Sequence, residues 1–331
     1  MRPLLRAELA RTRARSFVWF VAILAAVAGL GFVAMAWDDT RPPTAAQVRA
    51  AQDEFARAQA EWDRTGDDRV AQCREVEEQT REEHPDADLL CDQLAPVVEQ
   101  FLPYQSQLEE LGVQRLEPVT VLVVLAMLAI GVSLVSTDFA TGAMSTWLTF
   151  APRRGRVFAS KACAVLVAGL PIGVLVVGTV AGGIVAVTTW NGAFGEPGSW
   201  FWQEYLGLAA RQISAGLWAG LVGVGLAFAL RHAAAVAGLA VWWVAATESA
   251  LPVLLPVARG ATLSTNLVAW TTGGTSYDVP ECVPDPSTVT GEVCQDVAHV
   301  VSTAQGGLVL LAVALVVLGT GLLVFRLRDV T

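Results

Sequence analysis

Long apolar segments alternate with polar ones along most of this 331-residue chain. A helix needs about 20 apolar residues to cross a hydrocarbon core about 30 Å thick, and six segments approach or exceed that length. Five of them contain a long run without a charge, and the remaining one is interrupted only by Glu248. The pattern predicts spanning helices over 16–37, 119–137, 162–189, 205–230, 233–257 and 300–325.

The composition points to the same class of protein. Hydrophobic residues make up 54% of the chain and charged residues only 16%, with a mean hydropathy of +0.50. A soluble domain carries about 25% charged residues, so we expect an all-α integral membrane protein. The net charge is −9, from 22 basic and 31 acidic residues. This balance argues against a nucleic-acid partner, which would favour basic surfaces.

The distribution of basic residues predicts the orientation. Twelve lie in residues 1–15, in 138–161, at Arg231 and in the tail 326–331, whereas the short loop 190–204 has none. Because cytoplasmic loops are enriched in Lys and Arg, we expect both termini in the cytoplasm. We expect this multi-pass protein in the plasma membrane of a bacterial cell. Trp19 and Trp147 fall at the inner edge of that arrangement, where indole rings favour the headgroup level.

A cleaved signal peptide is the alternative for the first apolar segment. Arginines precede it, and Ala34-Met35-Ala36 follows as a small-residue site. The apolar run over 17–37 is longer than the 7–15 residues typical of such peptides. A spanning helix over 16–37 is therefore favoured.

Residues 38–118 form a polar insert too long to be a simple connector. It contains 20 acidic residues and 8 arginines. Apolar residues recur every three or four positions over 48–62, which predicts a helix, and further helices are expected over 69–83 and 87–111. We therefore expect a small extracellular lobe of two or three antiparallel helices. Its acidity indicates a solvated surface or, alternatively, a surface for cations or a partner.

The five cysteines test this topology. Two fall in the lobe (Cys73 and Cys91), two in the later external loop (Cys282 and Cys294), and Cys163 begins the third span. External pairs are typical of disulfides in an oxidising compartment. Three pairings are possible, and we favour Cys73–Cys91 and Cys282–Cys294 because each closes a local loop. The spacings are not those of zinc sites, so no metal site is expected.

The cytoplasmic connector over 138–161 carries the most specific pattern. Asp138 follows the second span, Gly142 allows a turn, and apolar residues recur at near-helical spacing before Pro152 and a basic cluster. On physical grounds alone, such an amphipathic helix lies at the headgroup surface.

This connector resembles that of the permease subunits of the type-2 ABC exporter class. The basic amphipathic start at 4–11 resembles the interfacial entry helix of that family, which implies a cytoplasmic interfacial helix over 1–15. The six-span layout is also similar. Asp138 stands where the family usually has Glu, Ala143 stands where Thr or Ser is common, and the large lobe is additional. The resemblance implies a coupling helix that docks on a separate ATP-binding subunit. Carried over, the docking residues are Asp138, Gly142, Trp147, Leu148, Pro152, Arg153 and Arg154.

The resemblance also implies two permease subunits, identical or related, with ATP and Mg²⁺ bound by the partner ATPase chains and membrane lipid around them. The chain itself has no phosphate-binding loop, because its sole lysine, Lys161, is followed by Ala162. We expect a non-enzymatic exporter subunit of unassigned substrate. The alternative is a membrane scaffold or receptor whose lobe binds a partner without transport.

Glu248 is the one acid within a predicted span and is a candidate for translocation or gating. Thr247 and Ser249 could donate hydrogen bonds to it, and Arg211 or Arg259 could pair with it. A structural pair near the outer surface is an equal alternative to a role in gating. Prolines and Gly260 predict a re-entrant segment over 258–270. An external disulfide loop is expected over 271–299.

Overall fold

The structure is a computed structural model that describes residues 2–84, 86–150, 152–284 and 292–328. It is mostly helical and contains six helices long and apolar enough to cross a membrane. The chain is therefore a multi-pass membrane protein by helix length and hydropathy. These helices are α2 (Ser16–Thr40), α5 (Val119–Ala140), α7 (Arg154–Trp190), α8 (Ser199–Leu230), α9 with its continuation through η3 and α10, and α12 (Thr303–Leu327).

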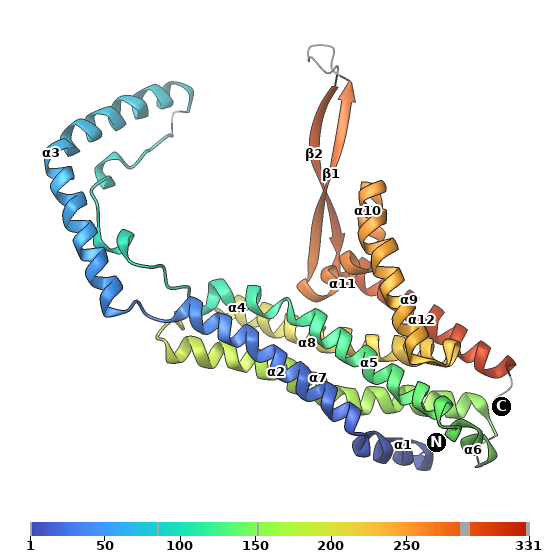
Figure 1. The fold of residues 1–331 in the computed structure, drawn as a ribbon. Helices are drawn as coiled ribbons and strands as arrows, with labels where there is room; N and C mark the ends of the chain where they lie inside the picture. Colours follow the sequence, from blue (N-terminus) through green and yellow to red (C-terminus); the bar gives the residue numbers. More distant parts are fainter. Residues whose placement is uncertain (1, 85, 151, 285–291, 329–331) are drawn as a thin grey trace.

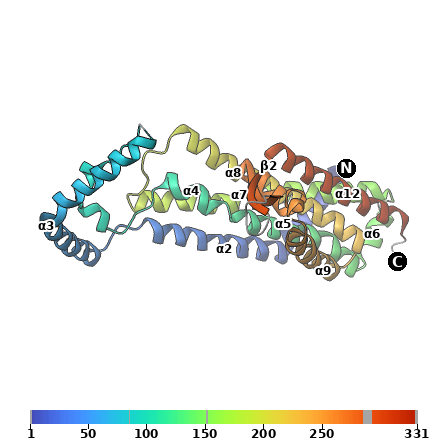
Figure 2. The same cartoon turned by 90° about the horizontal axis from the view of Figure 1, so that it is seen from above.

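Five of the long helices form a bundle in which α2, α5, α7, α8 and α12 lie side by side (Figures 1 and 2). The helix α1 (Arg2–Ala14) and the end of α12 lie at one end, which we call the termini end. The polar insert projects from the opposite end, which we call the lobe end (Figure 1). The sixth long helix leaves the bundle and rises beside a β-hairpin.

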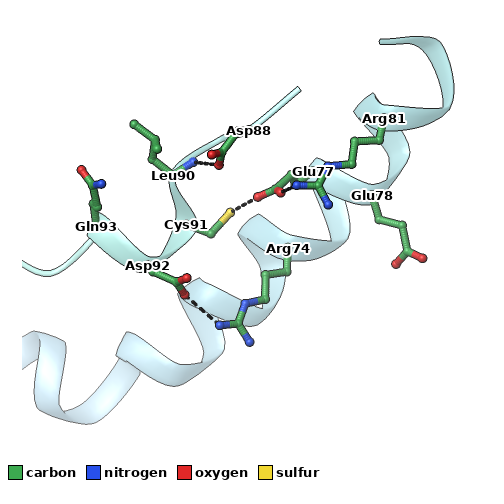
Figure 3. Close-up of a pocket in the computed structure, with 9 residues that line it drawn as sticks. All are labelled: Arg74, Glu77, Glu78, Arg81, Asp88, Leu90, Cys91, Asp92 and Gln93. Atoms are coloured by element: carbon green, nitrogen blue, oxygen red, sulfur yellow. Dashed lines mark hydrogen bonds and ion pairs between the residues drawn. The ribbon is translucent and has the colours of Figure 1, made fainter. Parts of the chain in front are cut away.

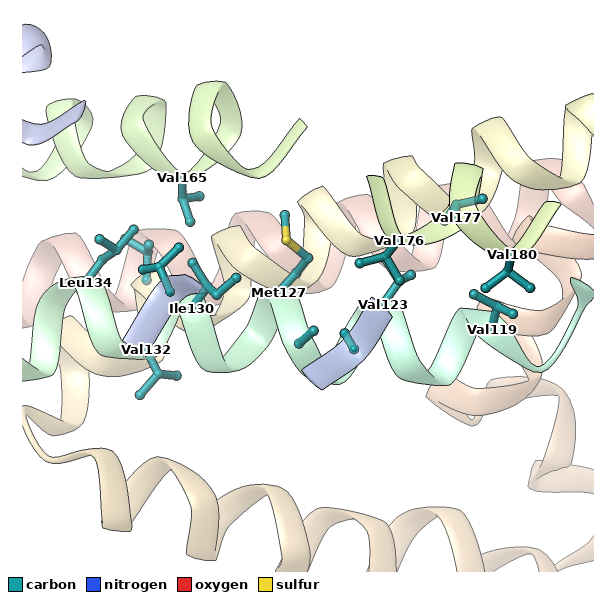
Figure 4. Close-up of a cluster of buried hydrophobic side chains, with 14 of the residues drawn as sticks. Val119, Val123, Met127, Ile130, Val132, Leu134, Val165, Val176, Val177 and Val180 are labelled. Carbon is teal, nitrogen blue, oxygen red and sulfur yellow. The ribbon is translucent and has the colours of Figure 1, made fainter. Parts of the chain in front are cut away.

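The core of the bundle lies around α5 (Figure 4). Val123, Met127, Ile130 and Leu134 recur at helical spacing on one face of α5, and all four are buried. A Cβ atom on Gly131 would lie 2.1 Å from the carbonyl oxygen of Gly220 on α8. These two helices therefore approach each other closely because position 131 is glycine.

The polar insert differs from the predicted antiparallel helices. One continuous helix, α3 (Ala45–Glu83), replaces the two expected over 48–62 and 69–83. It begins with a capping box in which Thr44 and Gln47 bond reciprocally. The residues between the two predicted helices include one glycine, Gly66. It does not break the helix, because a single glycine costs only about 1 kcal/mol there.

The helix expected over 87–111 is also wrong. The chain returns mainly in extended conformation, with short turns η1 (Cys91–Gln93) and η2 (Val98–Phe101), and only then forms α4 (Leu108–Leu116). Pro96 and Pro103 lie in this return segment. Proline lacks the N–H that a helix interior requires, which accounts for the absence of a long helix there.

A two-stranded sheet corrects the expectation of an all-α protein. Strands β1 (Gly274–Pro284) and β2 (Glu292–Ser302) pair antiparallel where a disulfide loop was predicted. Their β-branched residues favour strands. Cys282 lies directly opposite Cys294 in the register. The side chain of Cys282 falls outside the described part of the structure, so that disulfide stays a prediction.

The remaining elements connect the sixth long helix to the hairpin. This helix comprises α9 (Ala233–Trp243), the π-helical turn η3 (Val244–Ala250) and α10 (Leu251–Leu254). A 3₁₀ turn, η4 (Pro256–Ala261), and a short helix, α11 (Leu263–Thr272), follow and lie at the base of the hairpin.

Candidate functional site

The connector of the sequence resemblance contains a short helix, α6 (Ala143–Phe150), at the termini end of the bundle (Figure 1). Gly142 precedes it with a φ of +71°, a left-handed conformation that glycine adopts without steric cost. Asp138 lies before this turn in the last turn of α5, and Arg153 is the N-cap residue of α7. The helix α6 is thus held directly between two spanning helices.

Asp138 is not part of an exposed docking surface, because only 1% of its side chain is exposed. Three cations surround its carboxylate. Lys161 Nζ lies 2.5 Å from Oδ2, and Arg15 Nη2 lies 2.7 Å from Oδ1. Arg11 approaches the same carboxylate at 3.3 Å. Asp138 therefore joins α5 to both α1 and α7.

Glu8 completes this group of charges from α1. Its side chain is 2% exposed and lies 3.2 Å from Lys161 Nζ, which also donates to the carbonyl oxygen of Leu134 at 3.1 Å. Burying a charge is costly unless the charge is paired and hydrogen-bonded, and Lys161 meets both conditions. We call Glu8, Arg11, Arg15, Asp138 and Lys161 the charge cluster.

The sequence interpretation missed this cluster. It assigned Asp138 to docking and treated the α1 arginines only as markers of orientation. The available signal was Lys161, the only lysine of the chain, at the start of a long apolar segment. A charge in such a position requires a buried counter-ion.

A second anchor holds the other end of the connector. Arg154 Nη1 donates to the carbonyl oxygens of Phe325, Arg326 and Arg328 at 2.8, 3.2 and 2.7 Å. These carbonyls belong to the last turn of α12 and its C-cap, where a cation is favoured by the helix dipole. Arg154 thus ties the start of α7 to the end of α12 rather than facing a partner.

The remaining predicted docking residues are more accessible. Trp147 and Leu148 are half-buried, and Arg11 lies over the Trp147 ring at 5.4 Å. Pro152 and Arg153 are exposed. Phe150, at the end of α6, is 83% exposed and was not among the predicted docking residues. With residues of α1, the side chains of Trp147, Phe150, Pro152 and Arg153 line a hollow of about 600 Å³.

Glu248 is bound by neutral donors instead of an arginine. Its Oε1 accepts from Trp243 Nε1 at 2.9 Å and from the backbone N–H of Leu263 at 3.0 Å. Its Oε2 accepts from the N–H and the hydroxyl of Ser264 at 2.9 and 2.5 Å. The carboxylate therefore caps the N-terminus of α11 from the π-helical turn η3.

The expected arginine partners are used elsewhere. Arg211 Nε donates to the carbonyl oxygen of Thr271 at 2.8 Å, and Arg259 Nη1 donates to that of Asp278 at 3.4 Å. Both arginines hold the segments around the hairpin. The role of Glu248 in gating stays a prediction, since its contacts are those of a helix cap.

The lobe contains a charged hollow of about 610 Å³ beside η1 (Figure 3). Cys73 and Cys91 are joined by a disulfide there, as predicted. Arg74 pairs with Asp92 at 2.8 Å, and Arg81 pairs with Glu77. The dashed contact of 3.1 Å between Cys91 Sγ and Glu77 is not a hydrogen bond, because a disulfide sulfur has no hydrogen to donate. The lining charges thus largely satisfy one another.

No known protein-family model matches the sequence, and no curated protein is significantly similar to it. Among the described residues, no group of three or more His, Cys, Asp or Glu side chains is placed to hold a metal ion. The structure alone therefore supports a protein with six helices long and apolar enough to cross a membrane.

Proposed function

We propose that this chain is the membrane-spanning permease subunit of an ATP-driven ABC exporter. ATP and Mg²⁺ bind to a separate nucleotide-binding subunit on the side of the termini, which is the cytoplasm, and a second permease subunit completes the path across the plasma membrane. The observation that carries the proposal is the double anchoring of α6. Asp138 ties its preceding segment to α1 and α7, and Arg154 ties its following segment to α12.

This anchoring is what a coupling element requires. A packed protein interior has low compressibility and transmits displacement. A force applied to α6 therefore moves α1, α5, α7 and α12 together instead of bending the connector alone. The charge cluster adds resistance, because separating a buried ion pair leaves uncompensated charges in the membrane.

The exposed side of α6 supports the docking of a partner. Phe150 is 83% exposed beside the exposed Arg153, at the end of the bundle that bears both terminal helices. An exposed aromatic residue next to a cation is typical of a protein interface core. The transported substrate is not assigned.

The test compares two equally exposed aromatic residues at opposite ends of the molecule. Trp190, at the end of α7 on the lobe side, is 81% exposed and provides the control for Phe150. The tagged full chain is purified from native membranes in mild detergent, and co-purifying proteins and Mg²⁺-dependent ATP hydrolysis are measured. We expect a Walker-type ATPase with the unaltered chain and with Trp190→Ser, and its loss with Phe150→Ser.

Two outcomes contradict the proposal. The first is purification without any ATPase or ATP hydrolysis, which the scaffold alternative predicts. The second is retention of the ATPase at the same level by Phe150→Ser and by the double variant Trp147→Ala with Leu148→Ala.

A further inference from the structure

An apolar hollow lies between α1, the start of α2 and α7. Its volume is about 470 Å³. We call it the α1–α7 slot, and it plays no part in the proposed coupling. Its main lining residues are Arg13, Val18, Trp19, Val167, Ala168 and Leu175.

The mouth of the slot carries a cation that the charge cluster does not use. Arg11 and Arg15 point to Asp138, whereas Arg13 between them is exposed and forms no ion pair with any carboxylate in the described part of the chain. The indole Nε1 of Trp19 donates to the carbonyl oxygen of Arg13 at 2.9 Å. The indole of Trp19 is thus held against the backbone of Arg13.

The body of the slot is apolar and elongated. Val167 and Leu175 are eight residues apart on α7, which corresponds to about 12 Å along the helix. Both side chains are about half exposed, at 51% and 49%. The slot therefore runs from the end of the spanning helices into the depth of the hydrocarbon region.

We propose that the α1–α7 slot binds one anionic phospholipid of the leaflet on the side of the termini. The guanidinium of Arg13 binds the phosphate, because arginine presents several N–H donors in a geometry that matches phosphate oxygens. Trp19 lies at the level of the lipid glycerol, and one acyl chain occupies the slot against Val167 and Leu175. Basic pockets beside spanning helices are known to select such headgroups.

The test uses the purified full chain in nanodiscs of equal parts phosphatidylglycerol and phosphatidylcholine. The chain is transferred to mild detergent, and the lipids that remain bound are counted by native mass spectrometry. We expect the unaltered chain to retain phosphatidylglycerol preferentially. Arg13→Gln is expected to lower the ratio of retained phosphatidylglycerol to phosphatidylcholine about fivefold, the effect of one interfacial arginine.

Two further variants distinguish a site from general surface charge. Arg6→Gln removes an equally exposed arginine of α1 that does not line the slot, and we expect it to leave the ratio unchanged. Ala168→Phe fills the slot and is expected to abolish retention of the lipid while Arg13 is still present.

Three results would overturn the proposal. One is an equal loss of phosphatidylglycerol in Arg6→Gln and Arg13→Gln, which indicates unspecific attraction. Another is equal retention of the two lipids by the unaltered chain. The third is a dependence of the oligomeric state on Ala168→Phe without any effect of the headgroup, which identifies a second copy of the chain as the occupant. Arg13 is exposed, so Arg13→Gln decides the question even if Ala168→Phe fails to fold.

Discussion

Asp138 and Glu248 are both carboxylates within predominantly apolar helices, and the fold neutralises them in different ways. Asp138 is 1% exposed and meets three cations, contributed by α1, by the N-cap of α2 and by α7. Glu248 is partly exposed and meets only N–H and hydroxyl donors, three of them from the first turn of α11. One is an ion-pair centre and the other is a helix cap.

The two carboxylates also differ in how far along the sequence their partners lie. Asp138 binds residues 23, 123 and 127 positions away, so it joins segments that come together only in the folded bundle. Glu248 binds residues at most 16 positions away and holds one turn of chain against the next. An acid in an apolar segment can therefore fix the arrangement of whole helices or only a local turn. The nature of its donors decides between these roles.

The largest effect is expected at Lys161. Lys161→Met retains an unbranched side chain but leaves Glu8 buried without its cation and Asp138 with two arginines. Breaking a buried ion pair on one side costs about 3–5 kcal/mol. We expect the free energy of unfolding to fall by an amount in this range, measured by titration with a denaturing detergent in mixed micelles.

The control for Lys161 is Arg153→Met, which removes an exposed cation of the same region and should have little effect on stability. Adding Glu8→Gln to Lys161→Met should recover part of the loss, since it removes the uncompensated carboxylate. Unchanged stability of Lys161→Met, or no recovery in the double variant, would show that the cluster does not act as a buried ion-pair centre.

Hydropathy predicts the membrane-spanning helices because the thickness of the bilayer fixes their length and composition. The Cys73–Cys91 disulfide is predictable from the sequence because the two cysteines are only 18 residues apart. The charge cluster is different. Glu8 and Lys161 are 153 positions apart, and nothing local in the sequence of α1 distinguishes Glu8 from a solvated charge.

The β-hairpin is a second feature that the sequence did not predict. Pro280 and Pro284 lie in β1 and argue against a strand, because proline cannot donate to a ladder. A two-stranded hairpin has only edge strands, where proline is tolerated. Valine-rich alternation in β2 was the available strand signal. The spacing over 138–161 predicts the short helix α6 but not its packing. The family resemblance placed Asp138 and Arg154 at a docking surface, whereas both make contacts within the chain.

Glu248→Gln tests whether Glu248 acts as a helix cap. We expect a smaller loss of stability than for Lys161→Met. The amide has the same shape, but its NH₂ group would face the N–H and hydroxyl donors of Ser264 or the donors of Trp243 and Leu263. Leaving such groups unsatisfied costs about 1–2 kcal/mol at a partly exposed site. We expect faster hydrogen exchange of the Leu263 and Ser264 amides, measured by mass spectrometry, with little change around Lys161.

The matched control is Glu204→Gln, at an exposed acid on α8. It should leave exchange in α11 unchanged. If Glu248→Gln destabilised the whole chain as much as Lys161→Met, the contrast between a local cap and a centre of helix packing would be wrong.

The smallest effect is expected for Ser264→Ala. This variant removes the hydroxyl that donates to Glu248 at 2.5 Å but retains the donors from Trp243 and from the backbone. A single hydrogen bond contributes about 0.5–1.5 kcal/mol, and partial exposure favours the lower value. Exchange at Leu263 should rise less than in Glu248→Gln, whereas Ser249→Ala, at an exposed neighbour of Glu248, should change nothing. Equal effects of the two serine variants would mean that α11 is held by packing and not by its cap.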